Sequence, residues 1–273
     1  TREPVKVRRL ALPDASEPFA AVVGISDFHH GKYSDAGENW TAFNRDIARQ
    51  RLFDATADLL SRLRLYGRPE VIYVPIGSDF LHVDNDKGET TSGTPQDSDG
   101  TPAEMLVTGA ALLEEWIATL TQVAPVELVL MSGNHDRMMG LALLMVLEAT
   151  FRNHPGVTAR MDRTPRTYRA YGRNLIGFIH GDGVKKTRDI AGHMAQEAAE
   201  HWAHCTYKTA YTGHLHNERT ETDTIFNVTR RQLPSLAGTD RWHARNGFIG
   251  APASLPLYLH SKERGLVGVL YSP

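Results

Sequence analysis

Residue types that bind metal ions recur at five places where an apolar run of the sequence gives way to a polar loop. They are Asp27 with His29, Asp79, Asn134 with His135, His180, and His214 with His216. Carboxylate, amide oxygen and neutral imidazole suit manganese, iron or zinc, whereas calcium and magnesium prefer shells of oxygen alone. Two such ions about 3.5–4 Å apart activate a water and stabilise the attacking and leaving oxygens of phosphoryl transfer. A carboxylate must bridge the ions, and Asp79 is the candidate.

The spacing of these residues predicts how their side chains point. Asp27 and His29 are two residues apart after the apolar run "FAAVVGIS". Because side chains alternate between the two faces of a strand, we expect both to point the same way. His214 and His216 repeat this spacing. His30 should point to the opposite side, as an exposed or capping residue.

The elements that must position these residues are strands that alternate with helices. Apolar runs ending in Gly, Asp or His alternate with helical patterns, which is typical of an α/β fold. Residues 39–67 predict one long helix or two broken ones, and residues 101–120 open with a capping box, Thr101 and Glu104 around Pro102. Residues 167–183 predict a hairpin that turns between Tyr171 and Asn174. Loops at one end of such a sheet converge on a single cleft, so ligands distant in sequence can meet there.

Composition sets the limits of this interpretation. The chain has 273 residues, 41% of them hydrophobic, a net charge of −2 and a pI near 6.7, so it can build a sizeable core but has no overall attraction to nucleic acid or membrane. We expect a cytoplasmic protein, because no run is long enough to span a membrane and the first twenty residues lack the apolar centre of a signal peptide. Cys205 is the single cysteine, which excludes an intrachain disulfide and a thiolate cluster. Since the chain begins at Thr1, we expect processing or a piece of a longer protein.

Five short motifs resemble those of the calcineurin-like metallophosphoesterases. They are "DFH" at 27–29, "GSDF" at 77–80, "GNHD" at 133–136, "IHGD" at 179–182 and "GHLH" at 213–216, in the order of that family and spanning about 190 residues. One position departs from the family, which usually has Gly-Asp where this chain has Gly77, Ser78 and Asp79.

The resemblance implies a role for each motif residue. It implies that Asp27, His29 and His216 bind one metal, that Asn134, His180 and His214 bind the other, and that Asp79 bridges them. His135 would meet the phosphate and protonate or stabilise the leaving oxygen, with Asp136 orienting it. The fold implied is a single metallophosphoesterase domain over residues 1–273, a four-layer sandwich of two packed β-sheets flanked by helices. It includes an N-terminal lead-in (1–18) and a flexible acidic insertion (84–101).

A finer resemblance concerns the substrate. "DFLH" at 79–82 is similar to the double-strand-break repair (SbcD-like) nucleases of this family, in which the corresponding histidine helps to position the substrate phosphate. His82 is therefore a second catalytic candidate, and the alternative is a loop histidine that covers the apolar end of the second strand. Asp84 and Asp182 could act behind the ligands, with surface solvation as the alternative.

Clusters of basic residues are a second indication of the substrate. Seven arginines and lysines lie between Arg152 and Arg188, and a later stretch combines Trp242 with Arg230, Arg231, Arg241 and Arg245. Such clusters can follow a phosphate backbone, while the alternatives are a solvated face and a core or rim tryptophan. The acidic insertion opposes this interpretation, because over the cleft it would repel a long polyanion.

Together these observations predict a phosphoester hydrolase with two divalent metal ions. We expect Mn²⁺ first, with iron, zinc or nickel as alternatives, and a nuclease or phosphodiesterase that acts on DNA or another phosphodiester. One alternative is a phosphomonoesterase or small-nucleotide phosphodiesterase. Others are an inactive protein-binding scaffold and a nuclease module that acts with a further domain or partner subunit.

Overall fold

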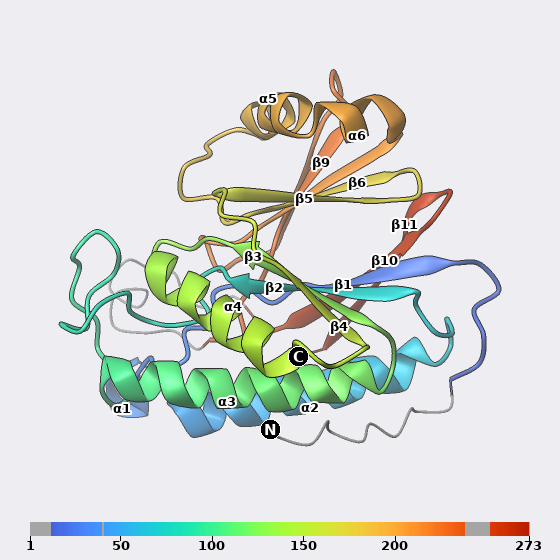
Figure 1. The fold of residues 1–273 in the computed structure, drawn as a ribbon. Helices are drawn as coiled ribbons and strands as arrows, with labels where there is room; N and C mark the ends of the chain where they lie inside the picture. The colour runs from blue at the N-terminus through green and yellow to red at the C-terminus, as the bar shows by residue number, and fades with distance from the viewer. Residues whose placement is uncertain (1–11, 40, 238–251, 273) are drawn as a thin grey trace.

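A six-stranded mixed sheet forms the centre of the molecule (Figure 1). The computed structural model describes residues 12–39, 41–237 and 252–272. In spatial order the strands are β11 (Gly265–Ser272), β10 (Leu255–Ser261), β1 (Phe19–Val23), β2 (Val71–Gly77), β3 (Val126–Met131) and β4 (Val157–Arg160). The neighbours from β1 to β4 are parallel, whereas β10 pairs antiparallel with both β1 and β11. The carboxyl ends of β1, β2 and β3 therefore lie along one edge.

The central strands of this sheet are apolar throughout because both of their faces are covered. In β1, Phe19, Ala21 and Val23 pack with the helices, while Ala20 and Val22 pack against the second sheet. This alternation follows from the two-residue period of a strand. One run of apolar residues thus contributes to two separate cores.

The second sheet has five strands. In spatial order they are β5 (Arg166–Tyr171), β6 (Asn174–Ile179), β7 (Tyr207–Thr212), β9 (Val228–Gln232) and β8 (Arg219–Asp223). The predicted hairpin is confirmed, because β5 and β6 pair antiparallel with Tyr171 opposite Asn174, and Gly172 turns the chain at φ +52°. Strands β6, β7 and β9 are parallel.

Helices cover the outer face of each sheet (Figure 1). Against the six-stranded sheet lie α2 (Arg45–Leu63), α3 (Pro102–Thr121) and α4 (Arg137–Phe151), while α5 (Thr187–Glu197) and α6 (Ala199–His204) lie beside the five-stranded sheet. A short helix, α1 (Ala36–Asn39), precedes α2. The predicted capping box is present: the Thr101 side chain accepts from Glu104 N–H, and the Glu104 carboxylate accepts from Thr101 N–H.

The layers run helix, sheet, sheet, helix, which confirms the predicted fold class. Within residues 39–67, Arg45–Leu63 form a single unbroken helix after the N-cap Asn44, which is the first of the two predicted alternatives. Within the part of the chain that the structure describes, the helices fall short of the length and apolarity needed to cross a membrane.

The acidic insertion, residues 84–101, forms a loop that is hydrogen-bonded to the body of the protein. Thr90 N–H donates to the Thr94 carbonyl at 2.9 Å, which closes a turn within the loop. Thr91 N–H donates to the Asn134 carbonyl at 3.1 Å, and Asp99 N–H donates to the Gly31 carbonyl at 2.7 Å. The flexibility of this loop stays a prediction, as does the extent of the single domain over 1–273.

Candidate metal centre

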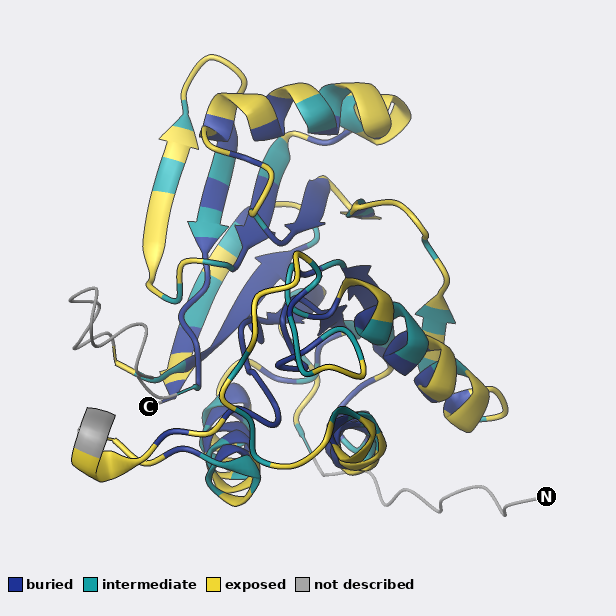
Figure 2. Cartoon of the chain, turned by 90° about the vertical axis from the view of Figure 1, so that its left-hand side faces the viewer, coloured by how far each residue is buried: buried dark blue, intermediate teal, exposed yellow. Residues whose placement is uncertain are grey.

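The candidate ligands come from both sheets. Asp27 and His29 follow β1, Asp79 follows β2, and Asn134 follows β3, all in the six-stranded sheet. His180 follows β6, and His214 and His216 follow β7, in the five-stranded sheet. Figure 2 views the molecule from the side on which these loops gather. The predicted convergence at the strand ends is therefore present.

One group of ligand atoms joins Asp27, His29 and His216. Their donor atoms all lie within 4.8 Å of one another. The Nε2 atoms of His29 and His216 face each other at 3.1 Å, and His216 Nε2 lies 3.3 Å from Asp27 Oδ1. These are the three residues predicted for the first metal.

A second group joins Asp79, His180 and His214 within the same limit of 4.8 Å. His180 Nε2 lies 3.0 Å from Asp79 Oδ2 and 3.0 Å from Asn134 Oδ1. The same Asn134 oxygen lies 2.8 Å from His214 Nδ1. The three residues predicted for the second metal, Asn134, His180 and His214, thus lie together with the predicted bridge.

Strand alternation does not explain why these side chains converge, and that part of the sequence prediction is wrong. β1 ends at Val23 and β7 ends at Thr212, before the ligands begin. Positive φ angles occur instead at Asp27 (51°), His29 (50°), Ser78 (57°), Asp79 (59°), His214 (74°) and His216 (54°). Left-handed backbone at a residue other than glycine costs about 1–3 kcal/mol and is concentrated at functional sites. Repeated left-handed turns, and not a pleated strand, bring the ligands together.

A repeated tripeptide, Ser-Asp-Phe at 26–28 and 78–80, contains two residues that the sequence analysis missed. The Ser26 and Ser78 hydroxyls lie 2.7 Å apart, and the Ser26 hydroxyl donates to Asp27 Oδ2 at 2.6 Å. The Ser78 hydroxyl lies 3.1 Å from His180 Nδ1, opposite the nitrogen that faces Asp79. The position that departs from the family pattern therefore orients a candidate ligand. The repeat was visible in the sequence and could have indicated this pair.

Burial and opposite charges shift the pKa values of the ligands. Burial alone would raise the pKa of Asp27, but the charge and hydrogen bond of His216 outweigh it and lower this pKa below 3.8. Burial opposes a proton on His180, yet the Asp79 carboxylate raises the His180 pKa to about 9. Burial first, and then the charges of His135, His216 and His82, hold the His29 pKa well below 6.5. His29 therefore stays a neutral ligand at neutral pH.

Asp136 supports the metal centre in another way than predicted. Its carboxylate accepts hydrogen bonds from the N–H groups of Asp79 at 3.0 Å and Leu81 at 3.1 Å. Burial, together with the charge of Asp79, raises the Asp136 pKa to about 8. Asp136 thus holds the turn that presents Asp79, whereas the His135 ring is held by a different group.

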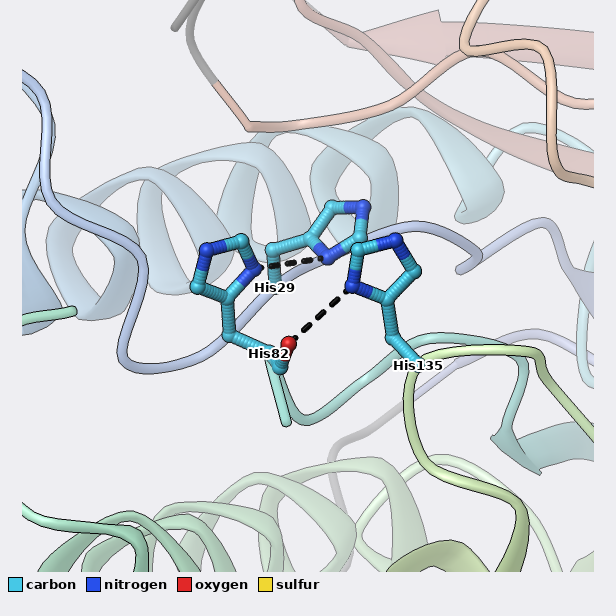
Figure 3. A group of neighbouring side chains, drawn as sticks. All are labelled: His29, His82 and His135. Carbon is cyan, nitrogen blue, oxygen red and sulfur yellow. Dashed lines mark hydrogen bonds between the residues drawn. The ribbon is translucent and has the colours of Figure 1, made fainter. Parts of the chain in front are cut away.

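The His135 ring is oriented by the backbone of His82 (Figure 3). His135 Nδ1 lies 3.0 Å from the His82 carbonyl oxygen, so this nitrogen carries a proton and Nε2 is left for the pocket. The His82 ring stacks on the His135 ring, with their centroids 5.6 Å apart, and its Nδ1 lies 3.2 Å from Nδ1 of His29. His82 therefore contacts the candidate ligand on the side away from His216.

Three further polar residues are placed by the structure. His30 faces away from the ligands as predicted, but it is buried and not exposed, with Nε2 2.8 Å from the Thr108 hydroxyl in α3. The Asp84 carboxylate accepts from the N–H groups of Met138 and Met139 at the start of α4. Asp182 lies 3.1 Å from Arg137 in an ion pair.

Acidic residues pair with many of the arginines between Arg152 and Arg188. Arg152 pairs with Glu148, Arg160 and Arg169 with Glu127, Arg166 with Glu197, and Arg188 with Asp223. Such pairing reduces the charge that the span can offer to a phosphate backbone. The residues Arg241, Trp242 and Arg245 lie outside the described part of the chain.

The arrangement of donors fits two divalent cations. Pairs of potential ligand atoms face each other at both groups, for example the two Nε2 atoms of His29 and His216 at 3.1 Å. The lone pair of a neutral imidazole nitrogen and a carboxylate oxygen can each bind a divalent cation. Each group combines one carboxylate with imidazoles, which is a donor set for manganese, iron or zinc.

Comparisons with known proteins give distant likenesses of fold. No protein-family model matches the chain, and no curated protein matches it. Vps29 from Entamoeba histolytica, in a complex with Zn²⁺, is 14% identical with a TM-score of 0.38 and covers 92% of this chain and 98% of its own. A protein from Streptococcus pneumoniae described as a predicted phosphoesterase is 11% identical with a TM-score of 0.37 and covers 94% and 98%. A dimetal phosphatase from Danio rerio is 11% identical with a TM-score of 0.45 and covers 93% and 99%.

Proposed function

We propose that this protein hydrolyses phosphate esters with two divalent metal ions. The observation that carries the proposal is the pair of adjacent ligand groups, Asp27 with His29 and His216 and Asp79 with His180 and His214, beside the half-buried ring of His135. Asn134 belongs to the second group through its side-chain oxygen. A purely structural site would not require the oriented histidine beside the ligands.

The residues divide the chemistry among them. When bound, the two ions would supply Lewis-acid activation of water and would offset the negative charge that develops on the phosphoryl oxygens. His135 would hold a proton on Nε2 for the leaving oxygen, because the His82 carbonyl fixes Nδ1. Asp136 keeps Asp79 in place through the backbone.

The test uses protein stripped with a chelator and reloaded with Mn²⁺. We expect about two ions per chain by elemental analysis and turnover of p-nitrophenyl phosphate or bis-p-nitrophenyl phosphate. His135→Ala should lower kcat by about 100-fold or more at unchanged metal content, because a general acid contributes about 10²–10⁴-fold. His201→Ala, at an exposed histidine of α6, is the matched control. Two bound ions without turnover of any ester would favour the scaffold instead.

Hydrolysis of DNA is the finer hypothesis within this function. The proximity of His82 to His29 and His135 supports it, because a third imidazole at the site could contact a phosphate. The ion pairs of the arginine span weaken it. End-labelled single- and double-stranded DNA incubated with the Mn²⁺-loaded protein would yield laddered products if the hypothesis holds, and none with His135→Ala.

A further inference from the structure

A cavity of about 510 Å³ lies over the metal centre. Its lining combines candidate ligand residues with the loop 84–101, which contributes Thr90, Ser92, Thr94, Gln96 and Asp97. This volume falls in the range of about 300–1,000 Å³ found for pockets that enclose a small organic molecule. The insertion therefore forms part of the pocket at the candidate ligands.

The first half of the loop is attached directly to the segment that carries Asn134. Thr91 N–H donates to the Asn134 carbonyl at 3.1 Å, and the Thr91 hydroxyl donates to Asp84 Oδ2 at 2.8 Å. Asp84 Oδ1 in turn accepts from Met138 N–H at 2.7 Å. The position of this wall is thus coupled to the position of the metal ligands.

The second half of the loop places Asp97 next to Tyr33 at the pocket. Tyr33 N–H donates to the Asp97 carbonyl at 3.1 Å, and both residues are exposed and line the cavity. Asp99 is engaged elsewhere, because its carboxylate accepts from Arg45 N–H at 2.9 Å. The acidic group that this half of the loop offers to the pocket is therefore Asp97.

The lining of the cavity suits one phosphate and not a chain of phosphates. Among the described residues that line it, none is Lys or Arg. A nucleic acid backbone is bound mainly by such cations, and Asp97 would repel the phosphates next to the one at the metals. Hydroxyl groups, an amide and a carboxylate are instead suited to bind the hydroxyls of a sugar ring. The Tyr33 ring offers a flat apolar surface beside them.

We propose that the loop 84–101 restricts the metal site to phosphate esters of a single sugar or nucleoside unit. Asp97, Thr94 and Gln96 bind the ring hydroxyls, and Tyr33 packs on the organic group. This inference rests on the proposed function and narrows its substrate. It opposes cleavage in the interior of a DNA strand.

Substrate comparison tests the proposal. The Mn²⁺-loaded protein is assayed with glucose 6-phosphate, adenosine 5′-monophosphate, the p-nitrophenyl ester of thymidine 5′-monophosphate, p-nitrophenyl phosphate and an end-labelled 20-nucleotide DNA. We expect kcat/KM for the best sugar or nucleoside ester to exceed that for internal cleavage of the DNA by at least 100-fold. Internal cleavage at a comparable kcat/KM would overturn the proposal. A preference for the nucleoside esters over glucose 6-phosphate would indicate that Tyr33 packs on a base.

Variants of the loop identify the residues that select the substrate. Asp97→Asn should lower kcat/KM for the sugar or nucleoside ester relative to p-nitrophenyl phosphate by about tenfold, since a hydrogen bond to a charged group is lost. Asp97→Lys should strengthen DNA binding. Asp86→Asn, at an exposed acid of the same loop outside the cavity lining, is the control and should leave the ratios unchanged. A variant with residues 90–96 replaced by two glycines should lose the discrimination against DNA.

Binding separates this inference from the proposed function. If no ester is turned over, calorimetry with the metal-loaded protein compares adenosine 5′-monophosphate with the 20-nucleotide DNA. If the monophosphate binds more tightly than the DNA, and Asp97→Asn weakens that binding, the loop selects single-unit phosphates even though the hydrolase proposal fails. Equal or tighter binding of the DNA overturns it.

Discussion

Three of the candidate ligands, Asp27, His180 and His29, are each contacted by a second residue that can fix their orientation. Ser26 bonds to Asp27, Ser78 bonds to His180, and His82 contacts His29 through Nδ1. Partners of this kind orient a ligand and tune its basicity, and their loss typically costs 10–100-fold in metal affinity or activity. The supporting residues are therefore as open to test as the ligands.

His82 allows a test of two different roles at the residue scale. Because its Nδ1 lies 3.2 Å from His29 Nδ1, we expect His82→Ala to weaken metal binding at the Asp27 group by about 10-fold or more. A competition titration with a chelator measures this, with His201→Ala as the control. Unchanged metal affinity with a reduced kcat would instead assign His82 to the substrate phosphate, as the sequence resemblance implies.

Buried His260 predicts a loss of stability in acid. Its Nε2 lies 2.6 Å from the Tyr211 hydroxyl, and burial, aided by the charge of Arg231, lowers its pKa from 6.5 to about 3. Below pH 6.5 the unfolded chain binds a proton that the folded chain does not, so the free energy of unfolding falls as pH decreases toward about 3, by up to about 1.4 kcal/mol per pH unit. Urea titrations at several pH values give the free energy of unfolding as a function of pH. This free energy should fall less steeply in acid for His260→Gln than for the parent protein. An equal dependence of the free energy of unfolding on pH in both proteins would contradict the role of His260.

At the scale of elements, the loops after β1 and β2 continue to pair beyond the strands. Asp27 N–H donates to the Ser78 carbonyl at 2.8 Å, and His29 N–H donates to the Asp79 carbonyl at 2.9 Å. These bonds hold residues with positive φ in place, and Phe28 stacks on Phe80 below them with centroids 5.0 Å apart. These hydrogen bonds hold the two loops together, so the positions of Asp27 and Asp79 depend on each other.

Gly213, after β7, is the point where the third loop approaches these two loops. A Cβ at this position would overlap the Ser26 hydroxyl and the Asp27 carboxylate. We expect Gly213→Ala to displace Asp27 and to reduce the metal content from about two ions per chain to about one, as measured by elemental analysis. Gly192→Ala in α5, where a Cβ meets nothing within 4 Å, is the matched control. Full metal content in Gly213→Ala would show that the loop after β7 can shift to accept the extra methyl group without displacing Asp27.

At the scale of the whole molecule, both metal groups join the two sheets. The first takes Asp27 and His29 from the six-stranded sheet and His216 from the five-stranded sheet, and the second combines Asp79 with His180 in the same way. Bound metal would therefore act as a link across the sheet interface, in addition to the apolar contacts of Phe178 and its neighbours.

Removal of the metal should accordingly destabilise the whole fold. A ligand that binds the folded state contributes about 2.7 kcal/mol per site at a free concentration of ~100 Kd. We expect the Tm of the chelator-treated protein to rise when Mn²⁺ is added, measured by calorimetry. His214→Ala combined with His216→Ala should abolish the rise. If two ions bind and the Tm does not change, the metal does not stabilise the packing of the two sheets.

Much of the architecture was predictable because it depends on local patterns. Apolar runs predicted the strands, the Thr101 and Glu104 pair predicted the start of α3, and the turn between Tyr171 and Asn174 was predicted within a hairpin. The ligand types and their positions after the strands follow from the same local signals. The reason for their convergence did not, since strand alternation was expected and left-handed backbone is found at Asp27 and His29.

The sequence by itself determined which residues can bind metal, the order in which they occur and the class of fold that carries them. The family resemblance implied which ligands share a metal, but only the tertiary structure shows His29 and His216 in contact, because they are 187 residues apart and belong to different sheets. The tertiary structure also decided that Asp136 supports Asp79, that arginines such as Arg166 are paired with acids, and that the insertion walls the metal pocket. These features depend on contacts between distant segments, and their energies are set by burial and distance, which a linear pattern does not contain.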